Sequence, residues 1–221
     1  MGYKVNIEFL QAHLPALLRG ALVSIQIGFF GSLIGILGGT FVGILQTTKS
    51  KIIKFFIVAY VNIVRGTPML IQIGLVHYVF FPLLEINSSA FVSAVTAIGL
   101  NSIAYISEVI RSGIQSVDKG QIEAAQTLGL SRIQTNLHIV LPQAIRNVIP
   151  ALGNELITLI KDSSLASTIG VYELLKEGSI VISRTYDALS VYLMVGIIYL
   201  IITSSLSLVM TILERKTKLK C

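Results

Sequence analysis

Long apolar runs separated by short polar intervals dominate the 221-residue chain. Between Gly20 and Thr48 there is no Asp, Glu, Lys or Arg, and this run exceeds the roughly 20 residues that a helix needs to cross a bilayer. Similar runs predict an all-α integral membrane protein with five transmembrane helices. The predicted spans cover about residues 20–46, 55–81, 88–110, 142–160 and 188–213.

The two ends of the chain differ from the predicted membrane domain, which covers residues 19–213. Within residues 1–18, Ile7, Leu10 and Leu14 lie at helical spacing among polar residues. This pattern predicts a helix in the membrane surface. The following apolar run is too long for a cleaved signal peptide, so the segment is expected to be retained. Residues 214–221 are predicted to form a basic tail.

Two sequence features predict how the first two spans pack. Four glycines recur every four residues in the first span and form a stripe that lets another helix approach closely, either as fixed packing or as a moving contact: Gly31, Gly35, Gly39 and Gly43. In the second span, Pro68 predicts a bend or break, because proline removes a backbone donor and restrains the residue before it. Arg65 there must face protein or water, or else reach the interface from a simple kink.

Composition and charge agree with a membrane protein. The chain is 53% hydrophobic and 13% charged, with a mean hydropathy of +0.80. Its net charge of +6 comes from basic residues placed between apolar runs, which indicates membrane topology and anionic lipid and not nucleic acid. The Lys49 loop, the polar loop 112–141 with its flanks, and the tail hold most of the basic residues. These parts are therefore predicted to be cytoplasmic, with the N-terminus outside.

The polar loop 112–141 is predicted to contain two short helices. Asp118 can cap the first, and Gly129 supplies the left-handed stop that a Cβ would penalise. Ser131 and Gln134 have the capping-box spacing that starts the second helix. A helix, a stop and a second helix predict a compact knob.

This loop carries a motif with fixed spacing. Glu123-Ala124-Ala125, three residues, Gly129, nine residues and Ile139-Val140-Leu141-Pro142 resemble the cytoplasmic coupling loop of ATP-binding-cassette (ABC) import permeases. The alternative is an ordinary capped helix-turn-helix. The resemblance implies a type I ABC importer permease fold, in which the first short helix inserts into a groove of a cytosolic ATPase. The implied coupling residues are Gly120, Glu123, Ala124, Ala125, Gly129, Leu141 and Pro142.

Further motifs are similar to those of the polar amino acid branch of these importers, which serves glutamine, glutamate, arginine, histidine and cystine. They are Arg65-Gly66-Thr67-Pro68, Ala104-Tyr105 with Glu108 and Arg111, and Gly153-Asn154-Glu155 leading to Lys161-Asp162-Ser163-Ser164-Leu165. Ser107 and Ser112 depart from the branch, which usually has alanine and glycine there. The resemblance implies a bacterial plasma (inner) membrane protein. Its implied partners are a cytosolic ABC ATPase dimer, a second permease subunit that is identical or closely related, and an extracytoplasmic amino-acid-binding protein.

The chain is not expected to be an enzyme. It lacks the glycine-rich phosphate loop of ATPases, so ATP and Mg are expected on the partner ATPase and no cofactor on this chain. His13, His77 and His138 lie far apart without metal-ligand spacing. The single cysteine, Cys221, excludes an intrachain disulfide.

A zwitterionic amino acid needs donors for its carboxylate and acceptors for its ammonium group, and a broken helix in a membrane exposes both. Polar residues aligned inside spans should face the bundle axis. The expected substrate path is Gly66, Thr67, Pro68, Asn101, Tyr105, Asn154 and Glu155. Glu155 is the candidate for a cationic group, and Lys161 with Asp162 is expected to form a gate or a structural ion pair. For each path residue, a helix–helix hydrogen bond is the alternative.

Three other functions compete with an amino-acid importer. An ABC permease for methionine, an osmoprotectant or another small solute would use the same machinery. A stand-alone secondary transporter or channel often shows inverted repeats, and none is visible in the five predicted spans. An enzyme within the membrane lacks any Ser, His and Asp grouping with the context of a nucleophile.

Overall fold

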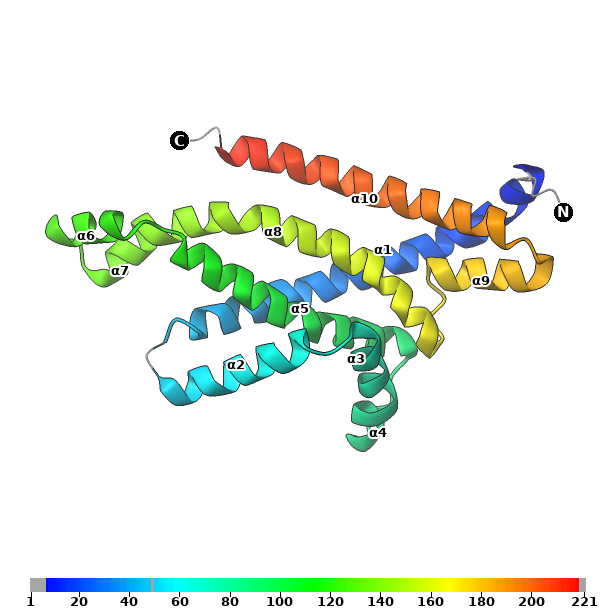
Figure 1. Ribbon diagram of the computed structural model, residues 1–221, viewed down its shortest axis with the longest axis horizontal. Coiled ribbons are helices and arrows are strands. Elements are labelled where there is room, and N and C mark those ends of the chain that lie inside the picture. Colours follow the sequence, from blue (N-terminus) through cyan, green and yellow to red (C-terminus); the bar gives the residue numbers. More distant parts are fainter. Residues whose placement is uncertain (1–6, 49, 219–221) are drawn as a thin grey trace.

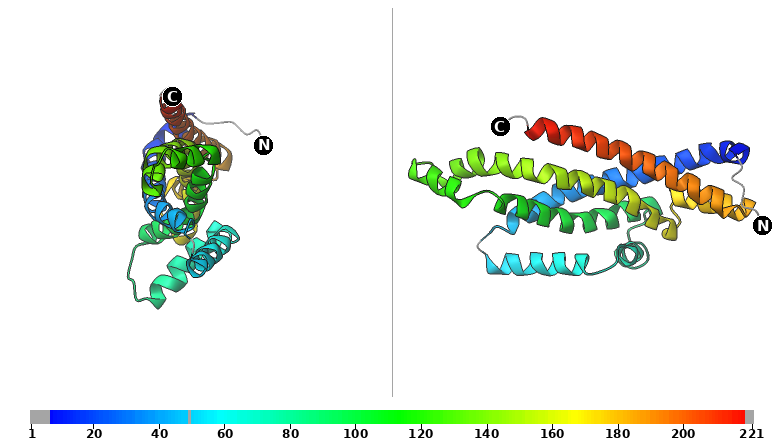
Figure 2. Two further views of the ribbon diagram at one scale, coloured as in Figure 1. Left: turned by 90° about the vertical axis from the view of Figure 1, so that its left-hand side faces the viewer. Right: turned by 45° about the horizontal axis from the view of Figure 1, so that its top comes forward.

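The computed structural model describes residues 7–48 and 50–218, and every regular element in that part of the chain is a helix. Four long helices run side by side along the molecule (Figures 1 and 2): α1 (Ile7–Leu45), α5 (Ala90–Gln115), α8 (Leu141–Asp162) and α10 (Ala188–Lys218). The predicted all-α architecture is confirmed. In Figure 1, the short helices α6 and α7 and the end of α10 lie at the same end of the bundle, opposite the beginning of α1.

Within the described part of the chain, three helices are long and apolar enough to cross a membrane, over Ala12–Leu45, Ala90–Gln115 and Ala188–Arg215. The predicted second span is broken: α2 (Lys51–Arg65) is followed by α3 (Met69–Leu75), a π-helical turn (Val76–Phe80) and α4 (Phe81–Leu83). The two halves are bent by 108°, so the predicted break is confirmed and is much larger than a kink. Counted together, they raise the number of candidate spans to four.

The helix ends differ from two predicted boundaries. Within the described chain, α1 begins at Ile7 and continues through Leu18, so the predicted surface segment and first span form one helix. Its location in the membrane surface stays a prediction. The last helix, α10, continues to Lys218, because nothing in residues 214–218 breaks a helix, so the predicted basic tail begins as helix.

The predicted glycine stripe of α1 packs against α5. A Cβ built on Gly31 would lie 2.7 Å from Ile98 Cγ2, and one on Gly39 would lie 2.7 Å from Ile106 Cβ. At Gly35 it would collide with Ser102 Oγ. Because these approaches are shorter than real Cβ contacts, the two backbones can pack at this distance only where α1 has no side chain. The predicted close helix contact is therefore confirmed, with α5 as the partner.

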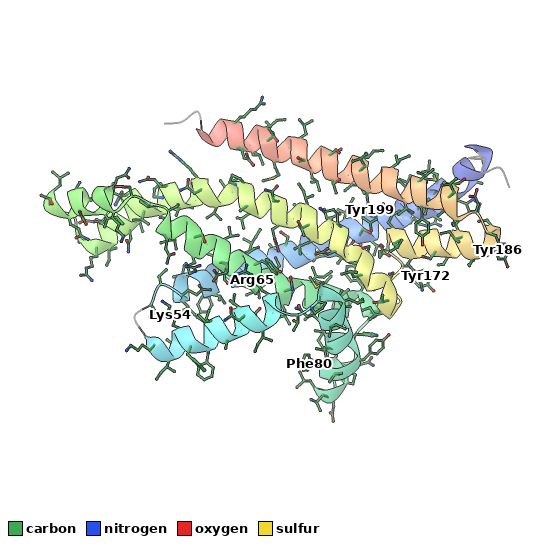
Figure 3. All side chains as sticks on the ribbon, viewed as in Figure 1. Lys54, Arg65, Phe80, Tyr172, Tyr186 and Tyr199 are labelled. Carbon is green, nitrogen blue, oxygen red and sulfur yellow. The ribbon has the colours of Figure 1, made fainter. Side chains whose placement is uncertain are left out.

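Between α8 and α10 the chain forms a short 3₁₀ helix (Ser163–Ile169) and α9 (Leu174–Thr185). Glu173 caps α9 and is fully buried. Its Oε2 accepts hydrogen bonds from Leu175 N (2.8 Å), from the hydroxyl of Tyr199 on α10 (3.1 Å; Figure 3) and from Ser24 Oγ on α1 (3.4 Å). Burial raises the pKa of the Glu173 carboxyl, because the charged form loses water. No local sequence pattern signals this junction of three helices.

Candidate functional site

The break between α2 and α3 is held by side chains that replace missing backbone donors. In a continuous helix, the carbonyl of Val64 would accept from the N–H of residue 68, and Pro68 has none. Gln72 Nε2 takes that place and donates to Val64 O at 2.7 Å. The hydroxyl of Thr67 donates to Ile63 O at 2.9 Å. Side-chain donors thus replace the backbone donors at the carbonyls of Ile63 and Val64.

Next to this break lies a cavity of about 170 Å³, here called the polar cavity. It is lined by Thr67, Met69, Asn101, Tyr105, Glu155, Thr158, Leu159 and Asp162. The wall therefore contains two carboxylates and no Lys or Arg among the described residues that line it. Glu155 Oε1 accepts a hydrogen bond from Ser102 Oγ at 3.2 Å. Two carboxylates in a confined space favour a ligand with a cationic group.

A larger cavity of about 470 Å³, here called the loop-side cavity, extends from the same region toward the coupling loop. Tyr105 lines both cavities, and the guanidinium of Arg65 lies 5.3 Å from the centre of its ring. Arg65, labelled in Figure 3, is the last residue of α2. Ser116 and Asn147 line the far end of this cavity and are joined by a hydrogen bond of 2.8 Å. Tyr105 is thus shared by the two cavities, and a cation–π contact holds Arg65 on its loop-side face.

A third cavity of about 290 Å³ lies on the other side of Arg65 and Glu108. Glu108 forms an ion pair with Arg111 at 2.7 Å. The described residues show no ion pair between Lys161 and Asp162, and their alternative role as a gate stays a prediction. Asp162, the last residue of α8, instead lines the polar cavity, because it lies two helical turns after Glu155 on the same face.

The structure brings together four of the predicted path residues. Thr67, Asn101, Tyr105 and Glu155, from three separate segments, line the polar cavity. Gly66 and Pro68 form the break beside it without lining it, and Asn154 is exposed on α8 outside the lining. Sequence reasoning missed Gln72 and Thr158, and it gave Asp162 a different role. Thr158 lies three residues after Glu155, a helical spacing that could have placed both on one face.

The predicted coupling knob is present. Asp118 caps α6 (Lys119–Thr127), and its Oδ1 accepts from Gly120 N at 2.7 Å. Gly129 has φ +85°, the left-handed conformation expected of it. The capping box of Ser131 and Gln134 starts α7 (Arg132–Thr135). A π-helical turn (Asn136–Val140) follows and leads into α8, where Leu141 and Pro142 occupy the first positions.

The knob is exposed and apolar at its tip. Leu128 is 80% exposed and Ile133 is 77% exposed, while Ala125 is buried between the short helices. Glu123 and Ala124 face outward. Gln143 Nε2, at the start of α8, donates to Gln121 Oε1 on α6 at 2.6 Å, so the knob is tied directly to the helix that carries Glu155.

Comparison with known proteins identifies the class. Residues 11–219 match the family described as the binding-protein-dependent transport system inner membrane component. The putative glutamine transport system permease protein GlnP of Rickettsia typhi is 36% identical over 200 residues, covering 90% of this chain and 92% of the relative. The probable amino-acid ABC transporter permease protein YckA of Bacillus subtilis is 38% identical over 214 residues, covering 97% and 94%.

Solved structures agree with this assignment. The crystal structure of an amino acid ABC transporter with histidines superposes with a TM-score of 0.91 at 34% identity, covering 97% of this chain and 100% of that chain. An inward-facing structure of the MetNI methionine ABC transporter has a TM-score of 0.76 at 20% identity, covering 92% and 97%, and shows the shared fold.

The chain belongs to the family of binding-protein-dependent transport system inner membrane components. It is thus a permease subunit of an ABC importer and a component of the bacterial inner membrane, with the type I permease fold of its structural neighbours. The resemblance of the coupling loop to those of ABC import permeases is confirmed at the level of the family.

Proposed function

We propose that this chain forms the membrane path of an ATP-driven importer for a polar amino acid. Relatives named as glutamine and amino-acid permeases, aligned over more than nine-tenths of their length, support the amino-acid cargo. The observation that carries the proposal is the polar cavity, where oxygen-bearing side chains of three segments meet beside a broken helix. Such a site suits the ammonium group that every free amino acid carries.

The proposed topology has five spans with the N-terminus outside. In it, α8 is the fourth span along the chain, although its polar residues keep it out of the set of spans selected by apolarity alone. Its packing against α1, α5 and α10 explains how those residues avoid lipid. The coupling knob and the end of α10 lie at one end of the bundle, which supports a common cytoplasmic side (Figure 1).

The proposed substrate path uses the residues around the polar cavity. Glu155 and Asp162 hold the cationic group, and Thr67, Asn101 and Tyr105 complete the wall. Gly66 and Pro68 shape the break. Asn154 contributes through its backbone carbonyl, which accepts from Thr158 Oγ1 at 3.0 Å.

The proposed partners follow from the family. A cytosolic ABC ATPase dimer carries ATP and Mg, and an extracytoplasmic binding protein delivers the amino acid. A second permease subunit, identical or closely related, completes the wall of the path. In this arrangement the exposed tip of the knob, with Leu128 and Ile133, docks on the ATPase. The direct link from Gln121 to Gln143 passes its movement to α8.

The test is binding of radiolabelled L-arginine, L-glutamine and L-histidine to the purified permease–ATPase complex without binding protein. Wild type is expected to bind at least one of them, and Glu155→Gln is expected to raise its Kd about tenfold, as for loss of a charge-assisted hydrogen bond. Thr211→Val, which removes a hydroxyl from the exposed face of α10, is the control. Equal Kd values for Glu155→Gln and wild type would remove the polar cavity as the substrate site.

A further inference from the structure

Gln72, on α3, stands between the helix break and the polar cavity without lining the cavity. Its amide makes hydrogen bonds in two directions. On one side Nε2 donates to Val64 O (2.7 Å), to Thr67 Oγ1 (2.8 Å) and to Thr67 O (3.1 Å). On the other side Oε1 accepts from Asn101 Nδ2 on α5 at 2.9 Å.

These contacts fix which way the Gln72 amide faces. Val64 O and Thr67 O are backbone carbonyls and can only accept. The NH₂ group of Gln72 must therefore face them, because an oxygen placed there would meet two acceptors. The amide of Gln72 has one orientation, and its carbonyl oxygen faces Asn101.

The orientation of Asn101 follows from that of Gln72. To satisfy Gln72 Oε1, Asn101 must present its NH₂ group, so its Oδ1 faces the other way. Asn101 lines the polar cavity, and its Oδ1 has no hydrogen-bond partner among the described residues. That oxygen is not among the buried unsatisfied atoms of the described chain, so it retains some accessible surface on a residue that lines the cavity.

We propose that Gln72 is a positioning residue that holds Asn101 with its carbonyl oxygen toward the substrate, which makes Asn101 an acceptor for a cationic N–H group of the amino acid. The inference rests on the proposed function of the polar cavity. With Asn101 held this way, the cavity offers acceptors from Glu155, Asp162 and Asn101 together. A reversed Asn101 amide would place a donor beside two carboxylates and attract one of them, in competition with the substrate.

The proposal also explains why the break and the site are joined. The donor that Pro68 lacks is replaced by the same side chain that orients Asn101. A change in the bend between α2 and α3 would therefore move Gln72 and turn Asn101 away from the substrate. Substrate recognition on α5 thus depends on the geometry of the broken helix.

The test is a double-mutant cycle on the purified permease–ATPase complex, with Kd measured for L-arginine, L-glutamine and L-histidine. Gln72→Met keeps the volume of the side chain and removes its hydrogen bonds. Gln72→Met and Asn101→Ala are each expected to raise Kd about tenfold, and the double variant is expected to raise it no further, because both changes remove the same acceptor. The control is Thr211→Val, with unchanged Kd.

Two results would overturn the proposal: an unchanged Kd for Gln72→Met, or losses that multiply to about a hundredfold in the double variant, which would mean that Gln72 acts only on the backbone break. If Glu155→Gln and Asn101→Ala weaken binding and Gln72→Met does not, this inference fails while the proposed function stands. If none of the three changes Kd, the proposed site itself fails. Equal losses for all three amino acids assign the α-ammonium group as the ligand of Asn101, and a loss for arginine alone assigns its guanidinium.

If Gln72→Met does not assemble, Gln72→His provides a second variant. A neutral histidine can donate from one ring nitrogen to Val64 O and accept from Asn101 Nδ2 at the other. The Kd of the Gln72→His complex for the amino acids is expected to stay within threefold of wild type. A loss of tenfold or more in an assembled Gln72→His complex would contradict the proposal.

Discussion

The two faces of α5 have opposite characters. Toward α1, its side chains fit against glycines at distances that leave no room for a Cβ. Toward α2, α3 and α8, the same helix places Asn101, Tyr105 and Glu108 on the walls of three cavities. The contrast teaches that one helix can serve as a wall for a polar path because its other face is fixed to a neighbour by close packing.

Ser102 lies where the two faces meet. Its Oγ faces Gly35 of α1 and also donates to Glu155 of α8. The position of a proposed substrate-binding carboxylate thus depends on the close packing behind it. The predictions below test this division of roles, from the largest expected effect to the smallest.

The largest effect is expected from Gly35→Leu on the closely packed face. The new side chain would collide with Ser102 and force α1 away from α5. Overpacking of this kind costs roughly 1–3 kcal/mol or more, so the Tm of the purified complex should fall by about 10 °C. The control is Gly196→Leu, because a Cβ at Gly196 meets nothing within 4 Å. Equal Tm values for the two variants would refute the role assigned to the stripe.

The second largest effect is expected from a substitution in the coupling knob. It should leave amino-acid binding at the polar face of α5 unchanged. Gly129→Val places a β-branched residue at φ +85°, which costs about 1–2 kcal/mol and should disorder the turn between α6 and α7. Amino-acid-stimulated ATP hydrolysis is expected to fall at least tenfold, while the Kd for the amino acid stays within twofold of wild type. Full stimulation in the assembled variant would show that the turn is not needed for coupling.

A smaller effect is expected from the buried carboxyl of Glu173, which joins α1, α9 and α10. Its pKa is raised by burial, so the folded state binds the proton more tightly than the unfolded state. This contribution to stability is fully present below the ordinary pKa of 4.5 and is lost as pH rises through the raised value.

The difference in Tm between Glu173→Gln and wild type should therefore change with pH, in favour of the variant as pH rises from 4.5 upward. Thermal unfolding of both complexes across this range measures it. Parallel Tm curves for the two proteins would contradict the assignment of a raised pKa to Glu173.

The smallest effect is expected from Asn154→Ala. Asn154 lies next to Glu155 on α8 but outside the face that lines the polar cavity. The side chain is exposed outside the lining of the polar cavity, and its contact with Thr158 uses the backbone. The Kd of the amino acid should stay within twofold of wild type, against a tenfold rise for Glu155→Gln. A loss as large as that of Glu155→Gln would place the Asn154 side chain in the path.

Much of the fold could be predicted because its signals are local. Pro68 lacks a backbone donor wherever it stands, so the break was visible in the sequence. Gly129 and the Ser131–Gln134 pair define a turn and a cap through residues three positions apart at most. The stripe of α1 also has a local period, although the sequence did not name α5 as the helix that packs on it.

The site was only partly predictable because its contacts are long-range. Gln72 meets Asn101 across 29 positions, and Ser102 meets Glu155 across 53. A glutamine in an apolar run has no local sign of such a role. Asp162 was assigned to its neighbour Lys161 on sequence proximity, whereas it lies at the end of α8 on the same face as Glu155 and lines the cavity. The role of Glu173 was also missed, because its partners Ser24 and Tyr199 are distant in sequence.

The central claim is that this chain forms a path that opens only through its coupling knob and a partner ATPase. The direct measurement is uptake of labelled amino acid by proteoliposomes that contain the chain alone, or the chain with its ATPase and binding protein. Uptake is expected only in the complete system, and only with ATP on the side of the knob. Uptake by the chain alone, or by the complete system without ATP, would contradict the account.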